Sequence, residues 1–205
     1  PTPEPGPGEV LVQLHTTGVN PSDVKKRAGG FPDLLAAGPV IPHSDGAGVI
    51  TAVGEGVSRS RVDERVFVYQ AQYGRQLGTA AQYVALDSTR APVLPDTASF
   101  EVGACIGIPI MTAHRCVFAD GPVADQLILV TGGAGRVGHY AIQWAHRAGA
   151  RVIATASNEE DATACREAGA EAVVNHREPD WGKAVLDLTE GQKESMVIVA
   201  VSYCW

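Results

Sequence analysis

The chain has 205 residues, of which 45% are hydrophobic and 19% are charged, and this composition is typical of a folded globular protein rather than a disordered one. Its formal net charge of -7 argues against non-specific binding to nucleic acid or to an anionic membrane surface, because both require a basic face. No apolar run approaches the roughly 18 residues that span a bilayer and no secretory leader is evident, so we expect a cytoplasmic protein without a membrane partner.

The first hundred or so residues predict a compact β-rich lobe. Short apolar runs alternate with glycine and proline, which is typical of strands joined by tight turns. These runs span residues 10–14, 48–53, 65–68 and 81–86. After Ala91 the pattern changes to one that suggests short helices, with Thr112 capping the last of them. We therefore place the domain boundary near Asp120, which gives domains of residues 1–119 and 120–205.

Strand and helix alternate through the second domain. The expected strands cover residues 127–131, 151–155, 172–174 and 196–201, and the expected helices cover about 137–148, 159–168 and 181–189. Gly149 and Gly169 stand where helix C-caps are expected, and the acidic run 159–161 favours the positive end of the second helix. This order predicts an α/β fold with four parallel strands joined by three crossovers.

A glycine-rich stretch follows the first of these strands. Gly133, Gly135 and Gly138 fit the pattern GxGxxG. In that pattern the first glycine allows the tight turn, the second lets the backbone approach a pyrophosphate, and the third lets the helix pack closely on the strand. Amides at the start of the helix, together with the positive end of its dipole, would hold the phosphates. The stretch therefore predicts a dinucleotide-binding turn.

The chain contains only part of such a domain. A doubly wound dinucleotide-binding sheet needs two mononucleotide halves, and here the first half and a fourth strand are present. The first residues enter strand sequence without an initiating Met. We therefore expect a fragment, with a lobe that is incomplete at its N-terminus and a truncated Rossmann sheet. The alternative is a genuinely short protein, whose fourth strand would be an open edge.

The residues after the second strand of this domain bear on the choice of cofactor. NAD-binding domains usually place a carboxylate about 20 residues beyond the glycine turn, where it accepts hydrogen bonds from the ribose 2′-hydroxyl. Residues 154–158 contain no carboxylate, which favours NADPH. The acidic run 159–161 is close to the same pocket; we expect it to cap its helix, and its charge also tempers this preference.

Several blocks stand in order along the chain. They are GVNPSD (18–23), IPHSDGAGVITAVGEGV (41–57), ERVFV (64–68), GTAAQYV (78–84), GACIGIPIMTAHR (103–115), TGGAGRVG (131–138) and VVNHRE (173–178). Together they resemble the zinc-free quinone oxidoreductases of the zeta-crystallin type, within the medium-chain dehydrogenase/reductase superfamily. The resemblance implies a GroES-like lobe followed by a Rossmann domain.

The resemblance also gives meaning to two substitutions. Zinc-dependent members of the superfamily carry a ligand cysteine where this chain has Asn20 and a ligand histidine where it has Ser44. Neither replacement is a good zinc ligand, and the four-cysteine structural zinc lobe is missing, so a zinc-free mechanism is implied. His43 lies one residue off the ligand position and is expected in a turn or a pocket wall. The four cysteines are widely spaced, which predicts reduced, buried thiols.

Contacts to the cofactor follow from the same resemblance. It implies phosphate contacts from Ala134, Gly135, Arg136 and Val137, and contacts around the adenosine end from Ser157 and His176. Arg136 replaces a glycine common in the family, and it would either bridge to phosphate or be a solvated side chain. Lys25 occupies a position where the zeta-crystallin pattern has a cofactor-contacting tyrosine, so we expect it beside the cofactor with an altered contact.

The implied chemistry is transfer of hydride from the nicotinamide to a quinone. Quinones suit a zinc-free site, because the anion that forms is delocalised and needs no strong Lewis acid. Asn20 is expected to be the polar group near the nicotinamide or the substrate oxygen, or else to fix the Asn20-Pro21 turn. Tyr69, Tyr73 and Tyr83 are expected to be packing residues, and no general acid is assigned.

Two other functions remain open at this point. An NADPH-dependent enone or enoyl reductase would also deliver hydride to a conjugated carbonyl compound and would use the same residues. Zeta-crystallin relatives also include lens proteins and binders of AU-rich RNA, although the net charge of -7 disfavours RNA. We expect the full-length protein to be a homo-oligomer, and the 205 residues alone not to turn over, because the missing half would supply part of the nicotinamide pocket.

Overall fold

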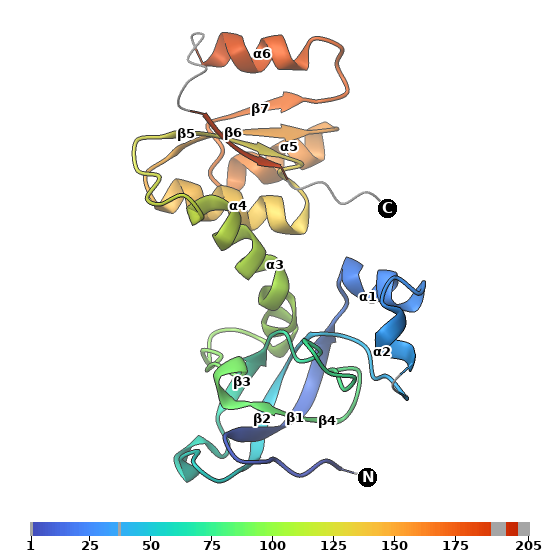
Figure 1. The fold of residues 1–205 in the computed structure, drawn as a ribbon. Coiled ribbons are helices and arrows are strands. Elements are labelled where there is room, and N and C mark those ends of the chain that lie inside the picture. The colour runs from blue at the N-terminus through green and yellow to red at the C-terminus, as the bar shows by residue number, and fades with distance from the viewer. Residues whose placement is uncertain (1, 37, 190–195, 201–205) are drawn as a thin grey trace. The chain divides into compact units, whose positions relative to one another are not determined.

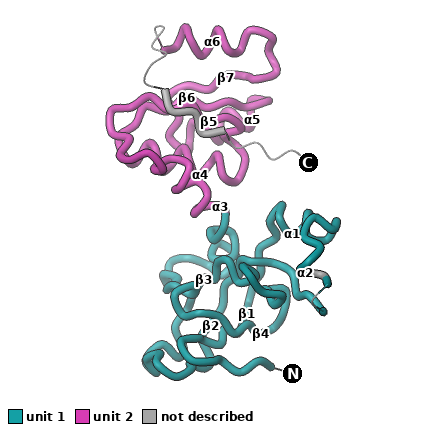
Figure 2. Tube along the Cα trace, viewed as in Figure 1, with its two compact units in different colours: residues 1–108 teal, residues 109–205 magenta. Residues whose placement is uncertain are grey.

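The computed structural model describes residues 2–36, 38–189 and 196–200, the last of these for the backbone alone. It forms two compact units, residues 1–108 and 109–205, each built around its own four-stranded sheet (Figures 1 and 2). Within the described residues, no helix has the length and hydrophobicity that a bilayer crossing requires.

The first unit contains an antiparallel sheet with strand order β3-β2-β1-β4. The strands are β1 (Glu9–Gly18), β2 (Asp45–Val53), β3 (Arg65–Val68) and β4 (Tyr83–Asp87). The predicted β-rich lobe is therefore confirmed, although β1 and β2 extend beyond their apolar runs. The buried face carries apolar side chains from all four strands, including the fully buried Ile50. Alternation along each strand directs these side chains into one core.

Two short helices of this unit were not expected from the sequence. They are α1 (Pro21–Arg27) and α2 (Pro32–Ala36), and each begins at a proline, which suits the first turn because its missing N–H has no helical acceptor. Two single turns of 3-10 helix also occur: residues 59–61 lie between β2 and β3, and residues 88–90 follow β4.

The prediction of several short helices after Ala91 is wrong. One helix of 19 residues, α3 (Phe100–Phe118), occupies most of that stretch, and Thr112 lies inside it rather than at its cap. Pro109 lies inside the helix, where its ring removes one backbone hydrogen bond, and Ala104, Ala113 and Val117 of the same helix are buried. The two compact units divide inside this helix, after residue 108, whereas a domain boundary at 119/120 stays a prediction.

The second unit contains the parallel sheet that the sequence predicts. Its strand order is β7-β6-β5-β8, with β5 (Leu127–Thr131), β6 (Arg151–Ala156), β7 (Ala172–Asn175) and β8 (Met196–Ala200). The helices are α4 (Arg136–Arg147), α5 (Glu159–Glu167) and α6 (Trp181–Leu188). Gly149 and Gly169 follow α4 and α5 with positive φ, as expected for residues that end a helix. Residue 201, expected at the end of the last strand, lies outside the described residues.

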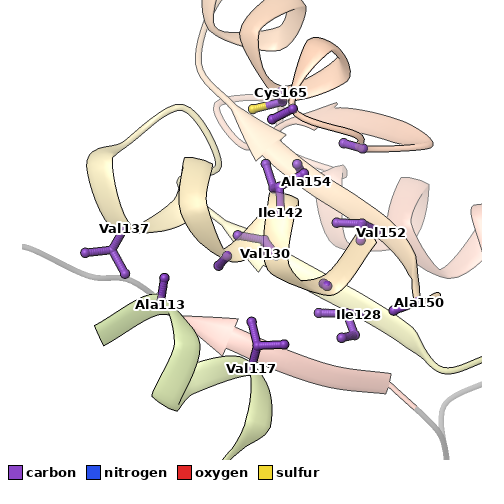
Figure 3. Packing of buried hydrophobic residues seen from close by; sticks show 14 of the residues in the cluster. Ala113, Val117, Ile128, Val130, Val137, Ile142, Ala150, Val152, Ala154 and Cys165 are labelled. Carbon is purple, nitrogen blue, oxygen red and sulfur yellow. The ribbon is translucent and has the colours of Figure 1, made fainter. Parts of the chain in front are cut away.

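Both faces of this sheet are covered by helices, which is the layering of a doubly wound fold. On one face, Ile128 and Val130 pack with Ile142 of α4 and with Val117 of α3 (Figure 3). On the other face, alternate strand residues pack with Val185 of α6.

The cysteines only partly follow the expectation of buried thiols. Cys165 is buried, whereas Cys105 and Cys116 are exposed, and Cys204 lies outside the described residues.

The buried core of the first unit leads to a stability prediction. Replacing Ile50 by Ala should lower the free energy of unfolding by about 2–5 kcal/mol, because it removes a fully buried side chain and leaves a cavity. Val93→Ala is the control, since that side chain is 59% exposed and its loss should change stability by less than about 0.5 kcal/mol. Urea unfolding followed by circular dichroism measures both, and equal losses would contradict the assignment of this core.

Candidate functional site

The turn between β5 and α4 is closed by Gly132, not by Gly133 as the sequence pattern predicted. Gly132 has a positive φ of 64°, and the Gly135 amide donates to its carbonyl oxygen at 2.9 Å. A Cβ on Gly133 would lie 2.8–3.0 Å from side-chain atoms of Ile142, Ala154 and Cys165. The tight turn therefore needs glycine at 132, while glycine at 133 makes room for the core beneath it.

Gly138 has the packing role that the pattern predicts. A Cβ there would overlap the carbonyl group of Gly132, so the helix can approach the turn only without a side chain at this position. The turn is also tied to β6, because the Gly132 amide donates to Thr155 Oγ1 at 3.0 Å and the Gly133 amide donates to the Thr155 carbonyl at 2.9 Å. Helix, turn and neighbouring strand are thus joined by a close contact and by two hydrogen bonds.

The start of α4 has the form of an anion site. Gly135 is its N-cap, with extended backbone, and is exposed, as is Arg136 at the first helical position. Val137 is buried beneath them. The first amides of a helix have no acceptor within it and lie at the positive end of its dipole, which together favour a phosphate.

Ser157 and His176 lie at the ends of the two neighbouring strands. Ser157 follows β6 and His176 follows β7, and Ala156 pairs with Asn175 in the parallel ladder. The His176 amide donates to the Ala156 carbonyl at 3.1 Å. The residues predicted to hold the cofactor in this unit, Gly133–Gly138, Ser157 and His176, therefore follow three adjacent parallel strands at their carboxyl ends. This is the edge where doubly wound sheets bind dinucleotides.

The acidic run after β6 forms the first turn of α5, where its charges lie at the positive end of the helix dipole, but none of the three acids is the N-cap. Asn158 is the N-cap of α5, and its Oδ1 accepts from the Asp161 amide at 2.9 Å. The Asp161 carboxylate in turn accepts from Asn158 Nδ2 at 2.8 Å and from Ser157 Oγ at 3.2 Å.

Cys165 of α5 lies below the glycine turn between β5 and α4. Burial raises the pKa of its thiol, and the nearby Asp161 charge adds to the shift.

In the first unit, Asn20 is buried at the start of α1. Its Nδ2 donates to Asp45 Oδ2 at 2.8 Å, and its amide donates to Asp23 Oδ2 at 2.8 Å. The Asp23 carboxylate thus caps α1 at the Asn20 backbone, while the Asn20 side chain is directed to Asp45 rather than to the Pro21 turn. The part played by Asn20 near the nicotinamide stays a prediction.

Asp45 is a buried carboxylate that joins three segments. Besides Asn20 it accepts from the Ile108 amide at 2.8 Å, while its Oδ1 is buried without a hydrogen-bond partner. Desolvation raises its pKa to about 6, against the hydrogen bonds from Asn20 and Ile108, and the charge of Asp23 adds to the rise. The start of α1, the start of β2 and the middle of α3 are thereby held together.

A pocket of about 730 Å³ opens beside these segments. Its lining includes Ser44, Ile108 and Lys26, next to the exposed aromatic rings of Phe31 and Tyr73. The expectation that Tyr73 is a packing residue is therefore wrong, because 69% of it is exposed.

His43 and Lys25 lie near this region but do not line that pocket. His43 has a φ of 72°, and its Nδ1 shares a hydrogen bond of 3.0 Å with Thr17 Oγ1. It lines a smaller cavity of about 330 Å³, in line with the turn and pocket-wall role expected of it. Lys25 is exposed on α1. Across residues 2–36, 38–189 and 196–200, no three histidine, cysteine or carboxylate groups gather as metal ligands would.

The close approach at Gly138 can be tested by one added methyl group. Gly138→Ala should lower the free energy of unfolding by about 1–3 kcal/mol, because the Cβ collides with backbone that cannot move without breaking the turn. Gly182→Ala is the matched control in α6, where a Cβ meets nothing within 4 Å and should leave stability unchanged or slightly higher. Urea unfolding compares the two, and equal effects would show that α4 does not depend on this contact.

The raised pKa of Asp45 predicts a dependence of stability on pH. Between about pH 4 and pH 6 the folded chain holds this proton more tightly than the unfolded chain, so the contribution of Asp45 falls as pH rises. The shift in pKa corresponds to about 3 kcal/mol of unfolding free energy, and this contribution is lost by pH 7. Asp45→Asn retains an acceptor oxygen and does not titrate. The difference in unfolding free energy between parent and variant should therefore shift by about this amount from pH 4 to pH 7, whereas parallel profiles would contradict the burial of a charged Asp45.

Comparisons with known proteins match both units. Residues 6–96 match the alcohol dehydrogenase GroES-like domain, and residues 137–203 match the zinc-binding dehydrogenase family. The quinone oxidoreductase of Mus musculus is 36% identical over 200 residues, which cover 97% of this chain and 59% of the relative. That of Homo sapiens is 38% identical over 182 residues, which cover 87% and 53%.

Solved structures agree with these relatives. An alcohol dehydrogenase superfamily protein from Novosphingobium aromaticivorans superposes with a TM-score of 0.85 at 35% identity, covering 94% of this chain and 58% of its own. The Escherichia coli quinone oxidoreductase, solved in complex with NADPH, gives a TM-score of 0.78 at 29% identity, covering 93% and 57%. The chain thus spans little more than half the length of its relatives. With a GroES-like unit followed by a Rossmann-like unit, and with quinone oxidoreductases as relatives, the chain belongs to the medium-chain dehydrogenase/reductase superfamily.

Proposed function

We propose that the protein is an NADPH-dependent reductase that transfers hydride to a quinone without zinc. The observation that carries this proposal is the alignment of the glycine turn, Ser157 and His176 along the carboxyl ends of β5, β6 and β7. In a doubly wound fold, the turn after the first strand holds the phosphates of a dinucleotide, and the ends of the next two strands hold its adenosine.

The residues present fit such a cofactor. Exposed Gly135 leaves the start of α4 open to a pyrophosphate, and glycines at 132, 133 and 138 let the backbone form the cradle. Ala134, Arg136 and Val137 would contribute the remaining phosphate contacts, with Ser157 and His176 around the adenosine. When bound, the nicotinamide supplies the hydride. The role of the chain is to hold that group in line with the acceptor and to exclude water.

NADPH is proposed over NADH because residues 154–158 contribute no carboxylate of their own that would repel a 2′-phosphate. The related Escherichia coli quinone oxidoreductase was solved in complex with NADPH, which supports the same choice. Lys25 is proposed as a further contact to the cofactor, in place of the tyrosine of the zeta-crystallin pattern.

A quinone is proposed as acceptor because the pocket in the first unit suits a flat conjugated ring. Phe31, Leu34 and Tyr73 contribute apolar surface, while Ser44 and Gln72 contribute polar groups. Asn20 and Ser44 stand at the two positions where zinc-dependent relatives carry ligands, and neither provides a good one. Asn20, oriented by Asp45, would then be the polar group nearest the reacting atoms. We further propose a cytoplasmic homo-oligomer.

The activity can be tested on the full-length protein with NADPH and a simple quinone. We expect quinone-dependent oxidation of NADPH that survives treatment with a zinc chelator, and tighter binding of NADPH than of NADH. Gly135→Asp should lower the affinity for NADPH about tenfold or more, because it places a carboxylate at the phosphate cradle. Gly135→Ser is the matched control, since Ser and Asp are both good N-caps and only Asp adds charge.

Each part of the proposal has an outcome that refutes it. Loss of activity with zinc removal would refute the zinc-free mechanism, and equal or reversed affinities would refute the preference for NADPH. Faster turnover of enones or enoyl thioesters than of quinones would favour the other reductase. Absence of turnover together with a salt-dependent shift of AU-rich RNA would favour the RNA-binding alternative.

A further inference from the structure

The Asp161 carboxylate is turned back onto the end of β6. Although Asp161 lies in the first turn of α5, its Oδ2 accepts from Ser157 Oγ at 3.2 Å and from Asn158 Nδ2 at 2.8 Å. The Asn158 side chain holds the Asp161 amide in return, at 2.9 Å. These reciprocal bonds fix the carboxylate beside Ser157, the first residue after the strand.

The other two acids of the same turn are placed differently. Glu159 forms an ion pair of 2.7 Å with Arg166, and its side chain is 80% exposed. Glu160 is exposed, whereas Asp161 is half-buried. Of these three neighbouring charges, Asp161 is the one that is both directed to the strand end and partly shielded from water, so its field is the least screened there.

The end of the second strand is where a doubly wound domain binds the adenosine ribose. A carboxylate at that place accepts a hydrogen bond from a 2′-hydroxyl and repels a 2′-phosphate. Residues 154–158 contain no such group, yet the fold brings one there from three residues further along the chain. The absence of a carboxylate in the strand-end sequence therefore does not mean that the strand end lacks one.

We propose that Asp161 is a specificity-determining residue that faces the adenosine ribose and opposes the 2′-phosphate, so that it limits the preference for NADPH over NADH. This inference rests on the proposed function, because it needs a dinucleotide along this edge. Like charges a few ångströms apart at a partly solvated site change a binding constant about tenfold, which sets the size of the expected effect.

The test compares adenosine 2′,5′-bisphosphate with adenosine 5′-diphosphate, two probes that bind without turnover. Titration calorimetry on the full-length protein gives the ratio of their affinities. Asp161→Asn keeps an acceptor oxygen for Ser157 and Asn158 and removes the charge, so the ratio should move about tenfold toward the 2′-phosphorylated probe. Glu160→Gln removes an equal charge from the same turn and should move the ratio less than about threefold.

Circular dichroism and thermal melting check that each variant is folded, and Asp161→Ser serves as a second uncharged variant if Asp161→Asn is not. A ratio that moves equally in the Asp161 and Glu160 variants, or in neither, would overturn the inference while leaving the cofactor site intact. Failure of the parent protein to bind either probe would instead overturn both the inference and the proposed function.

Discussion

The architecture of the second unit depends on one constraint, the close approach of α4 to the ends of β5 and β6. A side chain at Gly138 would overlap the Gly132 carbonyl, and one at Gly133 would press on Ile142, Ala154 and Cys165. Because neither position carries a side chain, the Gly132 and Gly133 amides can donate to Thr155, and α4 can begin at the edge of the sheet. Packing density therefore requires glycine at both positions, and the proposed phosphate site would use the same turn.

The first unit has a polar counterpart of that constraint. Asp45 binds Asn20 and the Ile108 amide from a buried position, and so fixes the relative placement of α1 and α3 at the pocket wall. Its burial raises its pKa, which means that the connection is made at an energetic cost when the group is ionised. A buried carboxylate at this place lowers the free energy of unfolding when it is ionised, but it fixes the geometry of the pocket wall. Asn20 thus belongs to a buried hydrogen-bonded group behind the pocket that Ser44 and Ile108 line.

Much of the second unit could be predicted from the sequence, because alternation of apolar strands and amphipathic helices is a strong periodic signal. The helices of the first unit were harder to predict from the sequence. Helices α1 and α2 are too short to show a period, and Pro109 inside α3 has the form of a helix boundary. Spacing alone could not tell that Gly132 rather than Gly133 has the left-handed backbone, since adjacent glycines satisfy the pattern equally. The position of the Asp161 carboxylate depends on its side-chain direction, which a window of consecutive residues does not contain.

Cys165 shows a further consequence of the bare glycine turn. Its sulfur fills the space beneath Gly133, where it is inaccessible to solvent, and its pKa is raised. Only the thiolate of a cysteine is strongly nucleophilic, so this thiol is shielded both sterically and electronically from alkylation. Quinones are themselves electrophiles that add to thiolates. In a protein proposed to reduce quinones, the cysteine beneath the glycine turn is therefore protected from this addition, whereas Cys105 and Cys116 are exposed.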